Sequence, residues 1–187
     1  ARLWRRLTDA PAAITDPAHR CRIQLLLGLL VVLVPLGLFS ISIQILLIPG
    51  FWSTFKAVAS ALVLLAAAYG LGRTGRYAAA ALITVGVSTA ASFAVVIFNP
   101  ADVMAHAFLS VSLLLAGLLF GYAGVWGMLL ACLLGVTGLL PALGVPPPNG
   151  DPVVVPMFLI ITAALLLIGI RQRDAVERER REELANS

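Results

Sequence analysis

The chain has 187 residues, of which 60% are apolar and 12% charged, with a mean hydropathy of +1.00 and a formal net charge of +4. A composition this apolar excludes an ordinary soluble domain. The positive charge favours anionic lipid headgroups near the helix ends as partners, rather than nucleic acid.

Basic residues fall into three short patches that are separated by long apolar stretches. Twelve of the thirteen Lys and Arg residues lie in residues 2–22, 73–76 and 171–181, and only Lys56 lies elsewhere. Basic residues in short loops stay on the cytoplasmic side of a membrane. The pattern therefore predicts an all-α polytopic membrane protein, a six-helix transmembrane bundle with its N- and C-termini in the cytosol.

In chain order, residues 1–16 are expected to form an amphipathic segment that lies on the inner headgroups. The pairs Asp16-Pro17 and Asp151-Pro152 are typical helix starts. The first helix is expected to run from Asp16-Pro17 to Ile48. The later stretches each have about the 20 residues needed to cross the hydrocarbon core. These spans are expected at residues 57–72, 77–98, 102–120, 123–143 and 152–170, so that residues 17–170 form the transmembrane domain.

The sixth helix is expected to continue beyond the membrane, over residues 171–187. Charged pairs four residues apart help to keep such a segment helical in water. We interpret it as a cytosolic signalling helix that begins a linker to an output domain outside this sequence, and the chain as a fragment of a longer protein. The residues expected to transmit the signal are Arg171, Arg173, Asp174, Glu177 and Arg178.

Glycines carry two further patterns. Gly70, Gly72 and Gly75 match the dinucleotide-binding string, but no strand precedes them and no acidic residue follows at the required distance. We interpret this segment as a cytosolic turn whose arginines contact phosphates. Gly117, Gly121 and Gly124 have a spacing that lets helices approach closely, and packing of the fourth helix on the fifth is favoured over a dimer face.

Five polar or soft side chains are expected near the outer ends of two helices. An ionisable residue at membrane depth is a candidate functional site, and Asp102 and His106 lie one turn apart. They could form an outward-facing ligand pocket, or Asp102 could cap its helix while His106 bonds to a neighbour. The candidate ligand-binding residues are Gln44, Asn99, Asp102, Met104 and His106.

Known catalytic and metal-binding motifs do not occur in the sequence. The polar set just described has too few donors for a metal site, and no nucleophile–base set or phosphate-binding loop is found. We therefore expect no catalytic residues, no metal and no cofactor, and no enzymatic activity in this part of the protein.

The chain resembles the six-helix N-terminal membrane modules of bacterial receptor histidine kinases, and the similar modules of membrane-anchored diguanylate and adenylyl cyclases. The resemblance lies in Asp16-Pro17-Ala18-His19-Arg20 and in residues 113–121, 139–148 and 171–180. It implies a parallel homodimer in the bacterial cytoplasmic membrane, whose sixth helices feed a PAS, GAF or kinase dimerisation domain. The expected function is that of a sensor or anchor module in a two-component or cyclase system.

Two other classes of function stay open at this stage. A small transporter or lipid-handling bundle would need discontinuous helices or polar sites at the midplane, for which Pro35 and Pro141 are hints. An accessory structural subunit of a larger membrane complex would be held by its lipid-facing surfaces.

Overall fold

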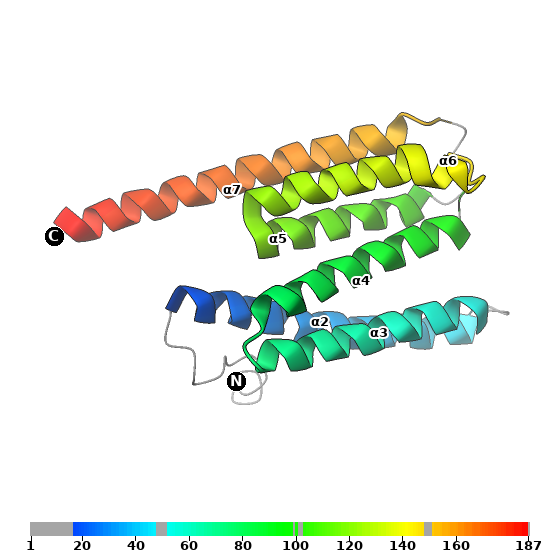
Figure 1. The fold of residues 1–187 in the computed structure, drawn as a ribbon, viewed down its shortest axis with the longest axis horizontal. Coiled ribbons are helices and arrows are strands. Elements are labelled where there is room, and N and C mark those ends of the chain that lie inside the picture. The colour runs from blue at the N-terminus through cyan, green and yellow to red at the C-terminus, as the bar shows by residue number, and fades with distance from the viewer. Residues whose placement is uncertain (1–16, 48–51, 99, 101–102, 148–150, 187) are drawn as a thin grey trace. The chain divides into compact units, whose positions relative to one another are not determined.

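The computed structural model describes residues 17–47, 52–98, 100, 103–147 and 151–186, and every regular element in these ranges is a helix (Figure 1). The prediction of an all-α protein is therefore confirmed. Among the described residues, four helices are long and apolar enough to cross a membrane, which is typical of a membrane-embedded protein. These candidate spans are Arg20–Phe39, Tyr77–Phe98, His106–Ala142 and Val154–Val176.

The chain divides into two compact units, Ala1–Ala91 and Ser92–Ser187. In the first unit, α2 (Pro17–Leu47) packs along α3 (Trp52–Arg73), and α4 (Tyr77–Phe98) begins in this unit and ends in the second. The two helices approach closely where α2 has Gly37, since a Cβ there would lie 2.7 Å from a methyl carbon of Leu62. The helix α3 begins before residue 57, the predicted start of the second span.

In the second unit, the helix α5 (Val103–Leu134) is divided by Gly121, whose φ of 65° and ψ of −142° are not helical. A positive φ is readily adopted only by glycine. The chain turns back there, so that α5 has a first arm (103–120) and a second arm (122–134) (Figure 1). Leu109 from the first arm and Val125 from the second lie in one buried cluster. The break falls within the turn predicted between helices 102–120 and 123–143.

Small residues bring the two arms into contact. A Cβ on Gly117 would lie 3.0 Å from Cγ2 of Val125, and a Cβ on Gly124 would overlap the carbonyl oxygen of Ala116 and lie 2.6 Å from Cβ of Phe120. Both glycines therefore let the two arms approach each other more closely than a larger side chain would permit.

The second arm does not continue as the regular helix predicted over 123–143. It passes into a π-helix, η1 (Gly135–Leu139), and then into the short helix α6 (Leu140–Ala142). Pro141 has no N–H and disrupts the regular hydrogen-bond pattern of the turn before it. The Phe93 ring packs against Gly135 at the start of this turn. It occupies the space that a Cβ on residue 135 would fill.

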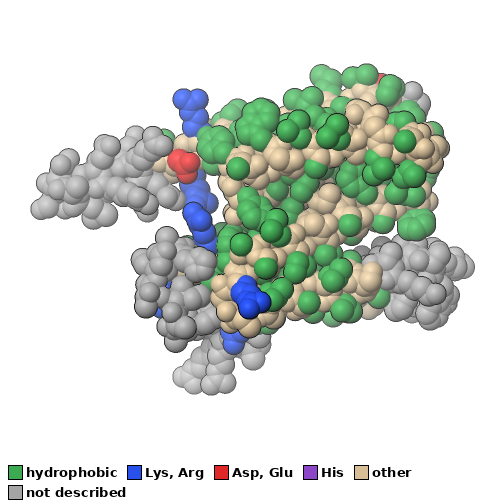
Figure 2. Space-filling model, viewed as in Figure 1, with side chains coloured by type: hydrophobic (Ala, Val, Ile, Leu, Met, Phe, Trp, Pro, Cys, Tyr) green, Lys and Arg blue, Asp and Glu red, His purple; other side chains and the backbone are tan. Residues whose placement is uncertain are grey.

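The last helix, α7 (Val154–Asn186), has 33 residues. At 1.5 Å per residue it is about 50 Å long. Its first part packs along α5, with Val155, Leu159 and Ala163 buried in the same cluster as Leu109 and Val125. On the face shown in Figure 2, hydrophobic side chains are spread over the described helices, with Lys and Arg away from the middle of the apolar spans.

Candidate functional site: a cavity beside His106

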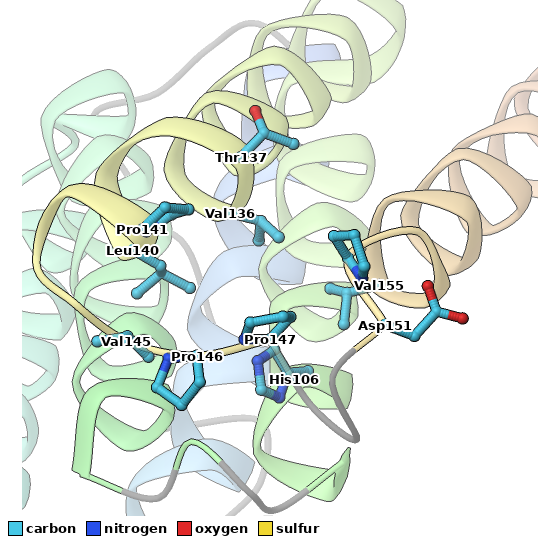
Figure 3. A pocket seen from close by; sticks show the side chains of 11 residues that line it. His106, Val136, Thr137, Leu140, Pro141, Val145, Pro146, Pro147, Asp151 and Val155 are labelled. Atoms are coloured by element: carbon cyan, nitrogen blue, oxygen red, sulfur yellow. The ribbon is translucent and has the colours of Figure 1, made fainter.

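The second unit contains a cavity of about 170 Å³ (Figure 3). Its walls come from the first arm of α5, from η1 and α6, from the loop after α6, and from the start of α7. Most of the lining side chains are apolar. The lining residues are His106, Val136, Thr137, Leu140, Pro141, Val145, Pro146, Pro147, Asp151, Pro152 and Val155.

Backbone hydrogen bonds fix both ends of the loop that borders the cavity. After α6, the N–H of Val145 donates to the carbonyl of Leu140 (3.0 Å) and the N–H of Gly144 donates to Pro141 (2.9 Å). This pair of bonds is a Schellman motif, which closes a helix C-terminus. Before α7, Oδ1 of Asp151 accepts a hydrogen bond from the N–H of Val153 (2.9 Å). The described parts of the loop are thus anchored to the helices on both sides.

His106 is the most polar side chain in the cavity wall apart from Asp151. Only 3% of its surface is exposed, and in Figure 3 its imidazole lies next to Pro147. The carboxylate of Asp151 points away from His106 in the same view and is engaged at the start of α7. A neutral imidazole has one donor and one acceptor nitrogen. His106 is therefore a polar group in a mostly apolar wall.

The irregular helix also affects the backbone of Val136, which lines the cavity. In an α-helix the carbonyl oxygen of Val136 would accept from the N–H of Leu140, but that N–H donates to Gly135 instead. In a π-helix it would accept from residue 141, which is a proline without an N–H. Both helical donors of this carbonyl are therefore lost. Segments of π-helix occur frequently at functional sites.

Of the five candidate ligand-binding residues, the structure describes the side chain of His106 alone. Gln44 lies in α2 and Met104 in α5, but their side chains are outside the described set, as are Asn99 and Asp102 altogether. The grouping of these five residues stays a prediction. Among the residues that the structure does describe, no three His, Cys, Asp or Glu side chains could hold a metal ion.

Sequence reasoning missed the wall formed by η1 and α6. It treated Pro141 as a hint of discontinuity and Asp151 as a helix start, without relating either to His106. The available signal was Pro141 within a long apolar helix, since a proline there deprives earlier carbonyls of a donor.

The residues expected to transmit the signal lie on α7, outside the cavity. Arg171 and Arg173 are exposed, and Asp174 is half-buried. Glu177 and Arg178 belong to the same helix, but their side chains are beyond what the structure describes.

The size and lining of the cavity limit what it could bind. A cavity of about 150 Å³ lined by apolar side chains can hold a molecule the size of benzene. The space beside His106 is slightly larger. It suits a compact, mostly apolar molecule with one hydrogen-bonding group. Comparison of the chain with protein-family models, with curated proteins and with solved structures finds no match.

Proposed function

We propose that the chain is a membrane sensor or anchor module that passes a signal through α7 to a cytosolic output domain. Six spans would be formed by α2, α3, α4, the two arms of α5, and α7, with both termini in the cytosol of a bacterium. The output domain would be a histidine kinase or a nucleotide cyclase, and two copies of the module would associate in parallel. The distribution of basic residues supports this orientation.

The observation that carries the proposal is the position of α7 at the cavity. Val155, in its first turn, lines the cavity and belongs to the buried cluster shared with both arms of α5. From there α7 continues to Asn186 as one helix. It has no proline after Pro156 and no glycine after Gly169. A change in packing at its first turns would therefore be transmitted along a stiff rod.

A ligand would act by binding one packing of these helices better than another. It can shift such an equilibrium only by its difference in affinity for the two states. Since the cavity wall includes both α5 and the start of α7, filling it would favour the packing in which the two are correctly spaced. Helix shifts of about 1–2 Å are a known form of such switching.

Insertions into α7 test this proposal. Residues 1–187 are joined to the kinase part of a receptor histidine kinase, and increasing numbers of alanines are inserted after Gln172. Each inserted alanine rotates the following residues by about 100°, so kinase activity should rise and fall with the number of alanines and recover at about seven. In the control, a flexible Gly-Ser segment replaces residues 173–187 and the same alanines are inserted after Gln172, which should abolish the alternation. A steady decline, or activity independent of insertion length, would contradict transmission through α7.

A small transporter is the second candidate, and the interruption at η1 favours it. Discontinuous helices beside a binding site are typical of secondary transporters, and η1 borders the cavity. Uptake of a small solute into proteoliposomes containing the purified chain would support this alternative over the sensor.

A further inference from the structure

Three helix ends meet at one end of the first unit. Ile23 and Leu27, near the start of α2, pack against Tyr69 near the end of α3 and Tyr77 at the start of α4. The approach is close, because a Cβ on Gly72 would lie 3.1 Å from a methyl carbon of Leu27. The start of α2 and the turn from α3 to α4 are therefore held together by buried contacts.

The turn between α3 and α4 has a defined conformation. The N–H of Arg76 donates to the carbonyl of Leu71 (3.2 Å), and that of Gly75 donates to Gly72 (3.1 Å), which is a Schellman motif. Gly75 has a φ of 84°, as this motif requires. The Thr74 hydroxyl also donates to Leu71 (2.8 Å). These hydrogen bonds lie within the turn and hold the backbone of Arg73 and Arg76 in one conformation.

Four arginines belong to this corner: Arg20, Arg22, Arg73 and Arg76. All four are exposed. Arg20 is three residues before Ile23 and so shares its face of α2, and Arg22 interacts electrostatically with the hydroxyl of Tyr77. Arg73 and Arg76 flank the turn itself. The helix contacts therefore gather four positive charges that are dispersed in the sequence.

The sequence around this corner is basic. Residues 17–101 contain no Asp or Glu. The corner also lies at the boundary of apolar helices, since Arg20 and Tyr77 begin two candidate spans and Arg73 ends the apolar helix Ala59–Arg73. Concentrated positive charge at such a boundary attracts anionic headgroups.

We infer that this corner is a binding site for the phosphate groups of an anionic lipid, with preference for a headgroup that carries two phosphates. A guanidinium can form two parallel hydrogen bonds to one phosphate, so two pairs of arginines match two phosphates. Tyr69 and Tyr77 suit the headgroup level, where tyrosine is enriched. The same phosphate chemistry could come from a free diphosphate, but the apolar helices beside the site favour a lipid.

The test measures lipid binding to the purified full chain in nanodiscs or by native mass spectrometry. Cardiolipin, phosphatidylglycerol and phosphatidylcholine are compared for the unmodified chain and for the double variant Arg22→Gln/Arg76→Gln. We expect a preference for cardiolipin, and about a thirtyfold loss of cardiolipin affinity in the variant. Equal binding of cardiolipin and phosphatidylcholine by the unmodified chain would overturn the proposal.

The matched control is Arg171→Gln/Arg173→Gln, which also removes two exposed arginines, but from α7. It should keep most of the preference; an equal loss would show a general charge effect and overturn the site. The variant Arg22→Lys/Arg76→Lys keeps both positive charges, and it tests the site even if the glutamine variant does not fold. It should lose the discrimination between one and two phosphates, and unchanged discrimination would contradict guanidinium recognition. Displacement of cardiolipin by micromolar pyrophosphate would overturn the assignment to a lipid.

Discussion

The N–H of Leu140 donates to the carbonyl of Gly135, five residues earlier, and not to that of Val136. This single shift turns a stretch of regular helix into η1. It leaves the carbonyl of Val136, a residue that lines the cavity, without a helical donor. The N–H of residue 141 would be the next in line, but residue 141 is a proline and has no N–H. Pro141 thus removes a helical hydrogen bond from a residue that lines the cavity.

Filling the cavity should abolish binding of small molecules there. We expect Val136→Phe to remove binding of phenol, which has the size and the single donor that the cavity suits, as measured by calorimetry on the purified protein. Leu130→Phe is the control, since Leu130 is 59% exposed on the second arm of α5 and outside the cavity lining. Binding of phenol that is unchanged by Val136→Phe would show that the cavity is not the binding site.

Removing the hydroxyl of two buried serines should have different effects on the stability of the protein. The Oγ of Ser110 has no hydrogen-bond partner among the described residues, so Ser110→Ala should leave the stability unchanged or raise it by about 1 kcal/mol. The hydroxyl of Ser92 donates to the carbonyl of Phe108 (3.1 Å), so Ser92→Ala should lower it by about 1 kcal/mol. Thermal unfolding in detergent compares the two, and equal destabilisation would imply a partner for Ser110.

Contact between the arms of α5 should depend on Gly124. We expect Gly124→Ala to destabilise the protein by about 1–3 kcal/mol, the usual cost of overpacking, because its Cβ would meet the backbone of Ala116. A Cβ on Gly127 would meet nothing within 4 Å, so Gly127→Ala should be neutral or stabilising by up to about 1 kcal/mol. If unfolding measurements show no difference between the two variants, the arms are not packed as described.

The proposed topology can be tested by cysteine labelling in intact cells. In a background without Cys21 and Cys132, we expect Ser53→Cys and Asn149→Cys to react with a membrane-impermeant reagent from outside. Thr74→Cys should be protected, because the turn that contains it carries Arg73 and Arg76. External labelling at Thr74 would contradict the six-span arrangement with cytosolic termini.

Replacement of His106 separates a sensing role from a structural one. If the cavity senses a ligand, His106→Ala should abolish the response while protein level and melting temperature change little. If the buried imidazole only packs and bonds to its neighbours, the variant should lose stability on the order of 1 kcal/mol, with output in proportion to protein level. A kinase chimera and a thermal melt distinguish the two results.

The sequence determined the all-α class and the positions of the turns, because these depend on local chemistry. Long apolar stretches without charge predicted membrane helices, and Gly121 was placed in a turn. The starts of α2 and α7 were likewise marked by Asp-Pro pairs, and Asp151 does bond to the backbone just before α7.

Only the tertiary structure decided which faces of those helices are buried. Leu113 is fully buried while its neighbour Leu114 is 41% exposed. In a membrane both the lipid and the protein interior are apolar, so the sequence gives no contrast between the two faces. For the same reason, the cavity between His106, η1 and the start of α7 depended on contacts among segments that are distant in the chain, and local sequence patterns could not reveal it.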